Sequence, residues 1–335
     1  MNMPTIRNIL LIQTASIGDV ILVTPIMERL HEALPDCNID LLVRKGHESL
    51  FVNHPFLHQL LVWDKKNQKH RNLLRLLIAI RKSHYDAVIT VQRFASSGLL
   101  TAFSGARHRV GFTKNPLSFA FSRRVKHLIG KGEHQPHEVE RNLTLIEWIV
   151  GKTSGTPRLY PSPADYAHTS ALKQKQYVCI APASLWFTKQ FPENQWIGFL
   201  QQVPPEMNVY MLGAPSDLPL CERILKAAGH ANSINLAGKL SLLESAALMR
   251  DATMNFVNDS APMHLCSAVN ARQTVIYCST VPAFGFGPLS DDAVVVETDE
   301  NLRCRPCGLH GYQTCPQKHF KCAITINQNK LLNRI

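Results

Sequence analysis

The feature that most constrains the fold is a unit that occurs twice in the chain. An apolar segment with few interruptions runs into a turn of small residues, and the turn opens an apolar helix start. The first copy covers residues 6–13, 14–19 and 20–25, and the second begins with residues 177–180 and continues through 181–192. A strand of this kind, with little alternation of polar and apolar residues, is typical of a parallel sheet that is covered on both faces.

Each copy is followed by further strand and helix patterns, which predicts two doubly wound α/β domains in tandem. In the first half we expect strands at residues 39–43, 60–63, 87–91 and 109–111 and helices at residues 71–83 and 96–104. In the second half the alternation continues through residues 196–202, 208–212, 217–228, 241–250, 254–257, 262–269 and 274–277.

The chain has 335 residues, which suits two domains that each bury a core. Gly, Ser, Thr, Pro and Lys dominate residues 151–174, where Pro157, Pro161 and Pro163 limit helix formation. We therefore expect a first domain at 1–160, a linker at 161–176 and a second domain at 177–335. Ligands of open α/β sheets bind beyond the carboxyl ends of the strands, so a central cleft between the domains is the expected site.

Composition and missing motifs exclude several classes of protein. Apolar residues make up 45% of the chain and charged residues 18%, which is a globular composition. The apolar runs are shorter than the roughly 20 residues of a membrane span, and no signal-peptide cleavage pattern follows the N-terminus, so we expect a cytoplasmic protein. Several common motifs are absent from the chain: GxxxxGK[ST], GxGxxG after a strand, HExxH and GxSxG. Their absence argues against common nucleotide-binding, metalloprotease and hydrolase families.

The net charge of +11 belongs almost wholly to the first half of the chain. Residues 1–160 carry 22 basic and 12 acidic side chains, and residues 161–335 carry 14 and 13. Nucleic acid could neutralise the excess, but no recognition helix or aromatic RNA-binding pattern is evident. An anionic glycolipid at the inner leaflet of a membrane fits better, and residues 116–121, between Lys114 and Arg123, are a candidate contact with that membrane.

Three local patterns at strand-to-helix junctions could carry chemistry. Ser16-Ile17-Gly18-Asp19 could place a carboxylate general base at the first strand end, or it could be a plain helix cap. Lys189 follows a loop of small residues and could face an anion, or it could be an ordinary surface lysine. The segment from Asn258 to Leu265 could present a helix N-terminus to phosphate, or it could be a capped helix with His264 in the core.

As a set, these residues resemble the glycosyltransferase family that contains the lipopolysaccharide heptosyltransferases. The resemblance covers nearly the whole chain, and the C-terminal cysteines resemble the second-heptose branch. The segments that carry it are Ser16-x-Gly18-Asp19 with Pro25, Tyr85-Asp86-Ala87-Val88-Ile89, Lys189-x-Phe191-Pro192 with Trp196, Gly213-Ala214-Pro215, Leu236-Ala237-Gly238 and Asn258-Asp259-Ser260 through His264. The chain departs from many relatives at Ala261-Pro262, where those relatives carry Gly.

The resemblance implies a two-domain fold of the B type and inverting transfer of heptose from ADP-heptose to an anionic lipopolysaccharide core. It implies that Asp19 activates the acceptor, with Ser16 and Gly18 on the acceptor side. It assigns the donor to Ser184, Lys189, Asp217, Asp259, Ser260, Ala261, Pro262 and His264. A fixed cation and helix N–H groups can stabilise a leaving diphosphate, so no cofactor is expected for catalysis.

The alternatives are another nucleotide-sugar donor, a protein acceptor, or a noncatalytic protein that binds nucleotides or nucleic acid. The expected partners are the donor, the lipopolysaccharide acceptor and the inner membrane, without nucleic acid.

Four cysteines near the C-terminus have the spacing C-x₂-C-x₇-C-x₆-C: Cys304, Cys307, Cys315 and Cys322. The first pair has the spacing of a metal knuckle, and four thiolates can bind zinc or iron. The later spacings do not repeat it, so disulfides or reduced thiols are alternatives. If a metal binds there, we expect a structural role.

Overall fold

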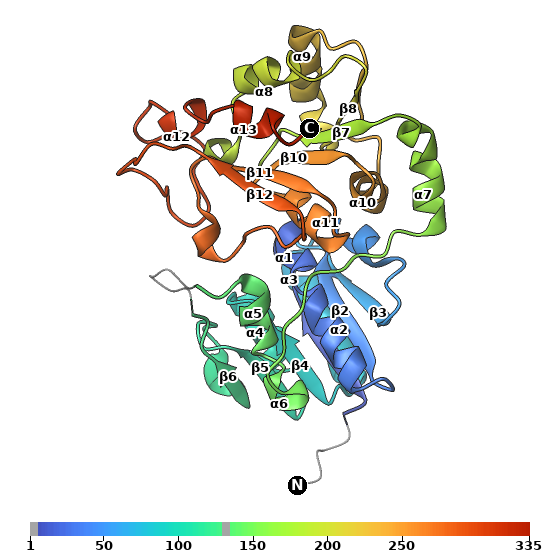
Figure 1. The fold of residues 1–335 in the computed structure, drawn as a ribbon. Coiled ribbons are helices and arrows are strands. Elements are labelled where there is room, and N and C mark those ends of the chain that lie inside the picture. The colour runs from blue at the N-terminus through green and yellow to red at the C-terminus, as the bar shows by residue number, and fades with distance from the viewer. Residues whose placement is uncertain (1–5, 129–134) are drawn as a thin grey trace. The chain divides into compact units, whose positions relative to one another are not determined.

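A computed structural model describes residues 6–128 and 135–335 (Figure 1). The contacts of the chain divide it into two compact units, Met1–Tyr160 and Pro161–Ile335. Each unit contains one sheet of six strands, and every strand pair is parallel. The prediction of two doubly wound α/β units in tandem is therefore confirmed.

The first unit has the strand order β3-β2-β1-β4-β5-β6. Its strands are β1 (Asn8–Ile12), β2 (Asn38–Arg44), β3 (Leu57–Trp63), β4 (Ala87–Thr90), β5 (His108–Phe112) and β6 (Arg123–Val125). Its helices are α1 (Ile17–Ile21), α2 (Thr24–Ala33), α3 (Lys69–Lys82), α4 (Ala95–Ala102), α5 (Glu138–Leu143) and α6 (Glu147–Val150). Residues 9–12 of β1 are fully buried, as expected for a central strand covered on both faces.

The second unit has the strand order β12-β11-β10-β7-β8-β9. Its strands are β7 (Tyr177–Ala181), β8 (Asn208–Met211), β9 (Ser233–Asn235), β10 (Met254–Asn258), β11 (Gln273–Tyr277) and β12 (Ala293–Glu297). Its helices are α7 (Pro163–Thr169), α8 (Glu193–Leu200), α9 (Leu218–Ala228), α10 (Leu242–Arg250), α11 (Ala261–Ala268), α12 (Lys321–Ile324) and α13 (Asn329–Leu332). The core includes Trp196, Phe199 and Phe256, which pack edge to face.

The segment expected to be a linker contains helix α7, which packs beside α10 (Figure 1). Lys173 follows α7, donates to the carbonyl of Ala247 in α10 and pairs with Asp251. By these contacts residues 161–176 form part of the second unit.

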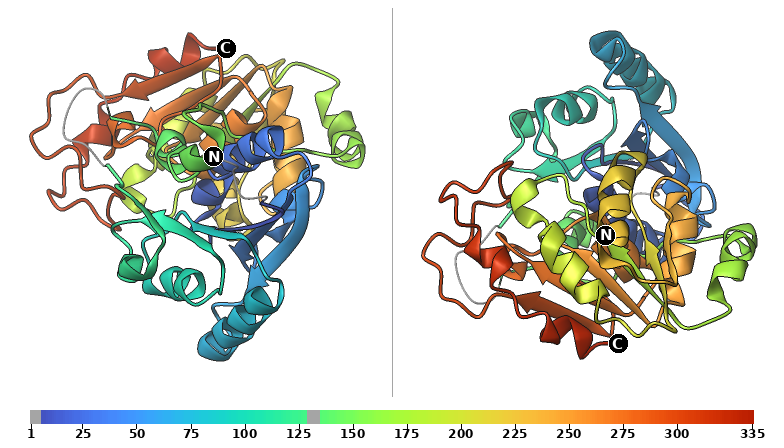
Figure 2. Two further views of the ribbon diagram at one scale, coloured as in Figure 1. Left: turned by 90° about the horizontal axis from the view of Figure 1, so that it is seen from below. Right: turned by 90° about the horizontal axis from the view of Figure 1, so that it is seen from above.

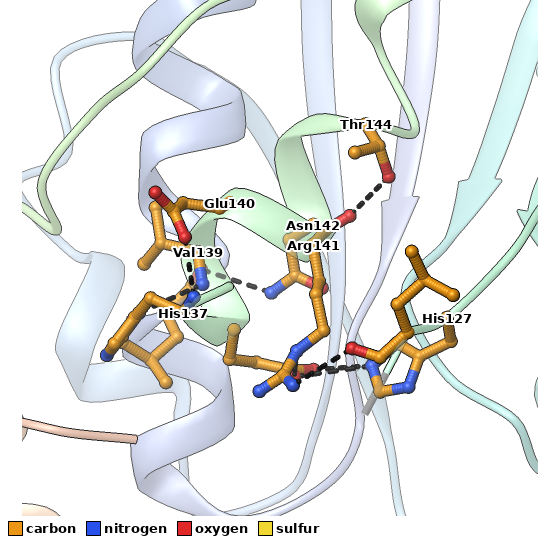
Figure 3. A network of polar contacts seen from close by, with 10 residues as sticks. His127, His137, Val139, Glu140, Arg141, Asn142 and Thr144 are labelled. Atoms are coloured by element: carbon orange, nitrogen blue, oxygen red, sulfur yellow. Dashed lines mark hydrogen bonds and ion pairs between the residues drawn. The ribbon is translucent and has the colours of Figure 1, made fainter. Parts of the chain in front are cut away.

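A polar network holds α5 in the first unit (Figure 3). The Arg141 guanidinium binds the Glu138 carboxylate at 2.8 Å, and His127 lies 3.2 Å from the same carboxylate. On the neighbouring turn, the Asn142 amide donates to the carbonyl of Leu22, the residue that ends α1. The Asn142 hydrogen bond thus connects α5 to the end of α1, the helix that contains Asp19.

No helix among residues 6–128 and 135–335 has the length and apolar character needed to cross a bilayer.

Candidate active site

Both sheets have a topological switch point, where the chain leaves two neighbouring strands in opposite directions. In the first sheet this point lies between β1 and β4, and in the second between β7 and β10. Switch points are where open α/β sheets bind ligands, because loops from adjacent strands diverge there. The predicted Asp19 turn follows β1, the Lys189 loop follows β7, and the Asp259-Ser260 pair follows β10.

The turn after β1 holds Asp19 in a defined orientation. Ser16 is the N-cap of α1, and its hydroxyl donates to Oδ2 of Asp19 at 2.6 Å while its backbone N–H donates to the same atom at 3.1 Å. This is a capping box, so the ordinary structural role of these residues is present. The buried Gly18 lies between them. The same hydrogen bonds fix a half-exposed carboxylate at the switch point, so capping and catalysis are compatible.

Two side chains that follow other strands of the same sheet brace this turn. Lys65, two residues after β3, donates through Nζ to the carbonyl of Thr14 at 2.8 Å and lies over the Trp63 ring. Gln92, two residues after β4, accepts at 2.8 Å from the Thr14 hydroxyl, and its buried Nε2 has no hydrogen-bond partner in the described part of the chain. Burial, followed by the positive charge of Arg44, lowers the pKa of Lys65 to about 8. The sequence patterns singled out neither Lys65 nor Gln92 as a site residue.

In the second unit, Asn258 at the end of β10 connects the two predicted donor segments. It is fully buried; its Nδ2 donates to the carbonyl of Pro182, and its Oδ1 accepts from the backbone N–H of Phe191. These two bonds fix both ends of the loop that contains Lys189. The loop contains a 3₁₀ turn, Phe187–Lys189, and α8 begins after it at Glu193.

Lys189 forms an ion pair with Asp259, with 2.7 Å between Nζ and Oδ2. The side chains of Lys189 and Asp259 are only 14% and 8% exposed. The Thr280 hydroxyl also donates to Oδ2 of Asp259 at 2.6 Å. Lys189 is therefore not an ordinary surface lysine; its ammonium is held beside the residue that precedes the α11 N-cap.

The α11 N-terminus is formed by Ser260, Ala261 and Pro262, all half-exposed. Ser260 is the N-cap and makes no side-chain capping hydrogen bond. Pro262 in the first turn lacks an N–H, so the backbone donors at this end are those of Ser260 and Ala261. His264 follows one turn later and is only 6% exposed.

The two remaining donor candidates lie in separate loops. Ser184 is half-buried, and its carbonyl accepts from Gln190 at 2.7 Å. Asp217 uses its carboxylate locally: Oδ2 accepts from the N–H of Ala214 at 2.8 Å, and Oδ1 accepts from Ser216. A ribose hydroxyl that bound to Asp217 would share a carboxylate that already accepts these two local hydrogen bonds. The ribose contact of Asp217 stays a prediction.

A C-terminal segment packs against the Lys189 loop, which the sequence did not reveal. Thr188 donates its N–H to the carbonyl of Tyr312, and the N–H of Tyr312 donates back to the Thr188 hydroxyl at 2.8 Å. Gly311 has a φ of +75°, and a Cβ there would lie 2.8 Å from the Thr188 hydroxyl and 3.1 Å from Cγ of Lys189. Arg305 anchors the segment through the carbonyls of Cys278 and Thr280. We call residues 305–312 the C-terminal strap.

Of the four cysteines, Cys307 lies within this strap, and Cys304, Cys315 and Cys322 lie before or after it in the chain. All are free thiols, and no group of three His, Cys, Asp or Glu side chains in the described residues could hold a metal ion. Cys304 Sγ lies 3.8 Å from Nε2 of His319. Burial raises the pKa of Cys322 to about 12, and the neighbouring Cys307, Cys315 and Cys304 add to the rise. The thiols are thus near one another, yet they are not arranged as ligands.

Comparison with known proteins places these features in one family. The family described as "Glycosyltransferase family 9 (heptosyltransferase)" matches residues 73–312. Lipopolysaccharide heptosyltransferase 1 of Campylobacter coli is 23% identical over 295 residues, 81% of this chain and 84% of that protein. Lipooligosaccharide heptosyltransferase 2 of Haemophilus influenzae is 24% identical over 314 residues, 88% of this chain and 89% of that protein.

A solved structure has the same fold. ADP-heptose LPS heptosyltransferase II of E. coli matches with a TM-score of 0.79 and 21% identity over 98% of this chain and 97% of that chain. The family match covers well over half of the sequence and includes the Lys189 loop, the α11 N-terminus and the whole C-terminal strap. The chain belongs to glycosyltransferase family 9, the heptosyltransferase family, and is a glycosyltransferase.

Proposed function

We propose that this enzyme transfers heptose from ADP-heptose to a sugar of the lipopolysaccharide inner core with inversion at the anomeric carbon. The names of the relatives support the donor and the acceptor. The observation that carries the mechanism is the carboxylate of Asp19, held by Ser16 at the switch point of the first sheet.

Asp19 acts as the general base in this proposal. Its carboxylate takes the proton of an acceptor hydroxyl as that oxygen forms a bond to the anomeric carbon of heptose. The bond from this carbon to the diphosphate breaks on the opposite face, and ADP leaves with the electron pair. Holding Oδ2 through Ser16 avoids the cost of orienting the carboxylate in the transition state.

The second unit stabilises the leaving group. Lys189 and the free N–H groups at the start of α11 offer positive charge where the diphosphate becomes more negative. Asp259 keeps the ammonium of Lys189 in place before the donor binds, and the diphosphate then competes with Asp259 for it. The first unit, with its excess of basic residues, binds the anionic acceptor, and the second binds the nucleotide sugar. Ser184, Asp217 and His264 remain proposed donor contacts.

Asp19→Asn tests the base directly. Asparagine retains an oxygen that can accept from Ser16, so helix α1 keeps its cap while the base is lost. We expect turnover to fall by about 10²–10⁴-fold, the usual contribution of a general base, with unchanged affinity for the donor. Asp165→Asn is the matched control, because Asp165 forms the same capping box with Ser162 at the start of α7. Undiminished turnover in Asp19→Asn would reject the assignment.

The donor and the acceptor need separate measurements. Thermal shifts with ADP-, UDP- and GDP-sugars identify the donor, since the tightest ligand stabilises the protein most. Mass spectrometry of a purified lipid acceptor after reaction shows whether one heptose is added. A mass gain only with another sugar, or only on a protein acceptor, would redirect the proposal to those alternatives.

We propose that the enzyme works in the cytoplasm, at the inner membrane that carries the acceptor. Fractionation of cells followed by a salt wash tests this: the protein is expected in the membrane fraction at low salt and in the soluble fraction at high salt.

A structural zinc or iron ion at the four cysteines is a separate proposal. Four neighbouring thiols match the chemistry of either metal, although they would have to move together to bind it. Elemental analysis of the purified protein tests it, with Cys304→Ser/Cys307→Ser expected to lose the metal and some thermal stability. A metal content below one tenth per chain would exclude a resident metal.

A further inference from the structure

The segment from Lys65 to Tyr85 has an unusual charge balance. It contains seven Lys and Arg residues and no Asp or Glu. Five of the seven lie on helix α3: Lys69, Arg71, Arg75, Arg81 and Lys82. None of these five forms an ion pair with a carboxylate anywhere in residues 6–128 and 135–335. Their charge is therefore not neutralised within the first unit.

The two faces of α3 differ in their surroundings. Leu73, Leu76, Leu77 and Ile80 pack on the core of the first unit beside Trp63. On the opposite face, Leu74 is 59% exposed and Ile78 is 47% exposed. These two are four residues apart, so they are neighbours one turn apart on the helix surface. Both views in Figure 2 show α3, in light blue, at the periphery of its own unit.

Cations surround the two exposed apolar side chains. Arg71 lies one turn before Leu74, and Arg75 directly follows Leu74. Arg81 and Lys82 lie one turn after Ile78. We call these six residues, Arg71, Leu74, Arg75, Ile78, Arg81 and Lys82, the outer face of α3. The exposed Phe103 lies at its end, because Arg81 donates to the Phe103 carbonyl at 2.9 Å. A helix with apolar residues between cations and without acids is typical of segments that lie on an anionic bilayer.

The segment that the sequence predicts as a membrane contact, residues 116–121, exposes fewer large apolar side chains than α3 does. Within residues 116–121, Phe121 is 6% exposed and packs against the position of Gly111. Phe119, at 74% exposure, is the large apolar side chain of this segment that reaches solvent. The segment thus presents one aromatic ring, whereas the outer face of α3 presents two adjacent aliphatic side chains among four cations.

We infer that the outer face of α3 docks the enzyme on an anionic phospholipid bilayer. The helix lies parallel to the membrane surface, Leu74 and Ile78 enter the layer between head groups and acyl chains, and the cations bind the lipid phosphates. The inference deepens the proposed function, since an enzyme whose acceptor is a lipid gains by residing on the surface that holds it. It names a docking surface outside the Asp19 turn and the Lys189 loop.

Vesicle sedimentation tests the inference without acceptor or donor. The whole enzyme is mixed with vesicles of phosphatidylglycerol and phosphatidylethanolamine, or of phosphatidylcholine alone, and the bound fraction is measured. We expect strong binding to the anionic vesicles only. Leu74→Gln/Ile78→Gln removes the apolar contacts and keeps good helix formers, and its partition coefficient is expected to fall at least tenfold. Arg75→Gln/Lys82→Gln is expected to cause a fall of similar size, about fivefold per charge.

Two controls carry the same type of substitution elsewhere. Leu185→Gln changes a side chain that is 79% exposed in the second unit, and Phe119→Gln changes the other candidate contact. Both are expected to bind vesicles like the wild type. Circular dichroism confirms that each variant is folded.

The possible results distinguish a failure of the docking inference from a failure of the proposed reaction. Unchanged vesicle binding in Leu74→Gln/Ile78→Gln, or loss of binding only in Phe119→Gln, would overturn the inference. The proposed reaction is measured independently with a delipidated, water-soluble core acceptor, on which Leu74→Gln/Ile78→Gln should be as active as the wild type. If the wild type is inactive on this acceptor and on the lipid acceptor, the proposed function fails even where the vesicle result stands.

Discussion

At the scale of single residues, the Lys189–Asp259 pair is expected to link stability to donor binding. Asp259 is almost fully buried and receives hydrogen bonds from two sides, from Lys189 and from Thr280. Sequence patterns indicated both residues of the pair as donor contacts but could not show that they contact each other, because 69 positions separate them along the chain. In the proposed mechanism, this ion pair holds the ammonium in place before the diphosphate binds.

Lys189→Met should therefore cost both stability and activity. The Asp259 carboxylate would remain buried without its cation, a loss of about 3 kcal/mol in the free energy of unfolding. The double variant Lys189→Met/Asp259→Asn removes the uncompensated charge, so we expect most of the stability to return while turnover stays low. Chemical denaturation and initial rates measure the two effects. Recovery of turnover in the double variant would show that Lys189 does not serve the leaving group.

Lys65 gives the enzyme a pH dependence that can be assigned to one residue. Its pKa is about 8 in the folded protein instead of 10.5, chiefly because burial disfavours the charged form. Between pH 7 and 9 the side chain loses its proton, so kcat/KM for the anionic acceptor should fall as the pH rises. Lys65→Arg stays charged over this range and should show a flatter profile.

Folding stability should change with pH in the opposite direction. The unfolded chain binds the Lys65 proton more tightly than the folded chain, so the unfolded state holds more protons between pH 8 and 10.5. The contribution of this group to stability therefore increases as the pH rises through that window. Melting temperatures of the wild type and Lys65→Arg across the window test this. Equal slopes in the two proteins would contradict it.

At the scale of elements, the C-terminal strap supports the Lys189 loop through Gly311. Gly311→Ala would place a methyl group 2.8 Å from the Thr188 hydroxyl, at a φ of +75° that side chains rarely adopt. The strap must then move away from the loop, and we expect the KM for the donor to rise several-fold.

Gly308→Ala separates backbone strain from displacement of the loop. Gly308 has a φ of +66°, but a Cβ there would meet only the Tyr312 hydroxyl, at an ordinary 3.6 Å. Both variants should lose about 1–2 kcal/mol of stability from the strained backbone conformation. Only Gly311→Ala should weaken donor binding, measured by calorimetry with ADP. Equal donor affinity in both variants would mean that the strap does not position Lys189.

Most of the strands that the sequence predicted lie inside the sheets, although the prediction also included β3, an edge strand, at residues 60–63. The central strands β1, β4 and β7 are mainly apolar, because a strand covered on both faces is buried along most of its length, and β10 has the same burial although it contains Asn255 and Asn258. The edge strands β6, β9 and β12 were not predicted. β6 has the sequence Arg-Arg-Val and β9 has Ser-Ile-Asn, so both are short and polar, as edge strands often are. β12 is the exception, since Ala-Val-Val-Val-Glu carries a strand signal.

The residues of the candidate site also divide into those that the sequence could predict and those that it could not. Asp19, Lys189 and Asp259 could be found because each directly follows a central strand or its loop. The Lys65, Gln92 and Gly311 contacts depend on which loops the sheet order brings together. Local sequence patterns do not contain that order, so these contacts required the structure.

At the scale of the whole molecule, the division of charge between the two units gives different salt dependences for the two substrates. The first 160 residues carry a formal charge of +10 and the remaining 175 a charge of +1. Exposed cations act on an anion over about 10 Å at 0.1 M salt and over about 3 Å at 1 M. We therefore expect binding of the anionic acceptor to weaken strongly as salt is added.

The donor should respond less, because in the proposed mechanism its diphosphate binds at short range to Lys189 and to N–H groups of α11, and the second unit is nearly neutral. From 50 to 500 mM sodium chloride, the KM for a water-soluble core acceptor is expected to rise at least tenfold and the KM for ADP-heptose less than threefold. A soluble acceptor keeps membrane docking by α3 out of the measurement. Repeating the titration with Lys114→Gln/Arg124→Gln, two exposed cations of the first unit, should reduce the acceptor's salt dependence alone. Parallel changes in both KM values would show that the charge of the first unit does not select the acceptor.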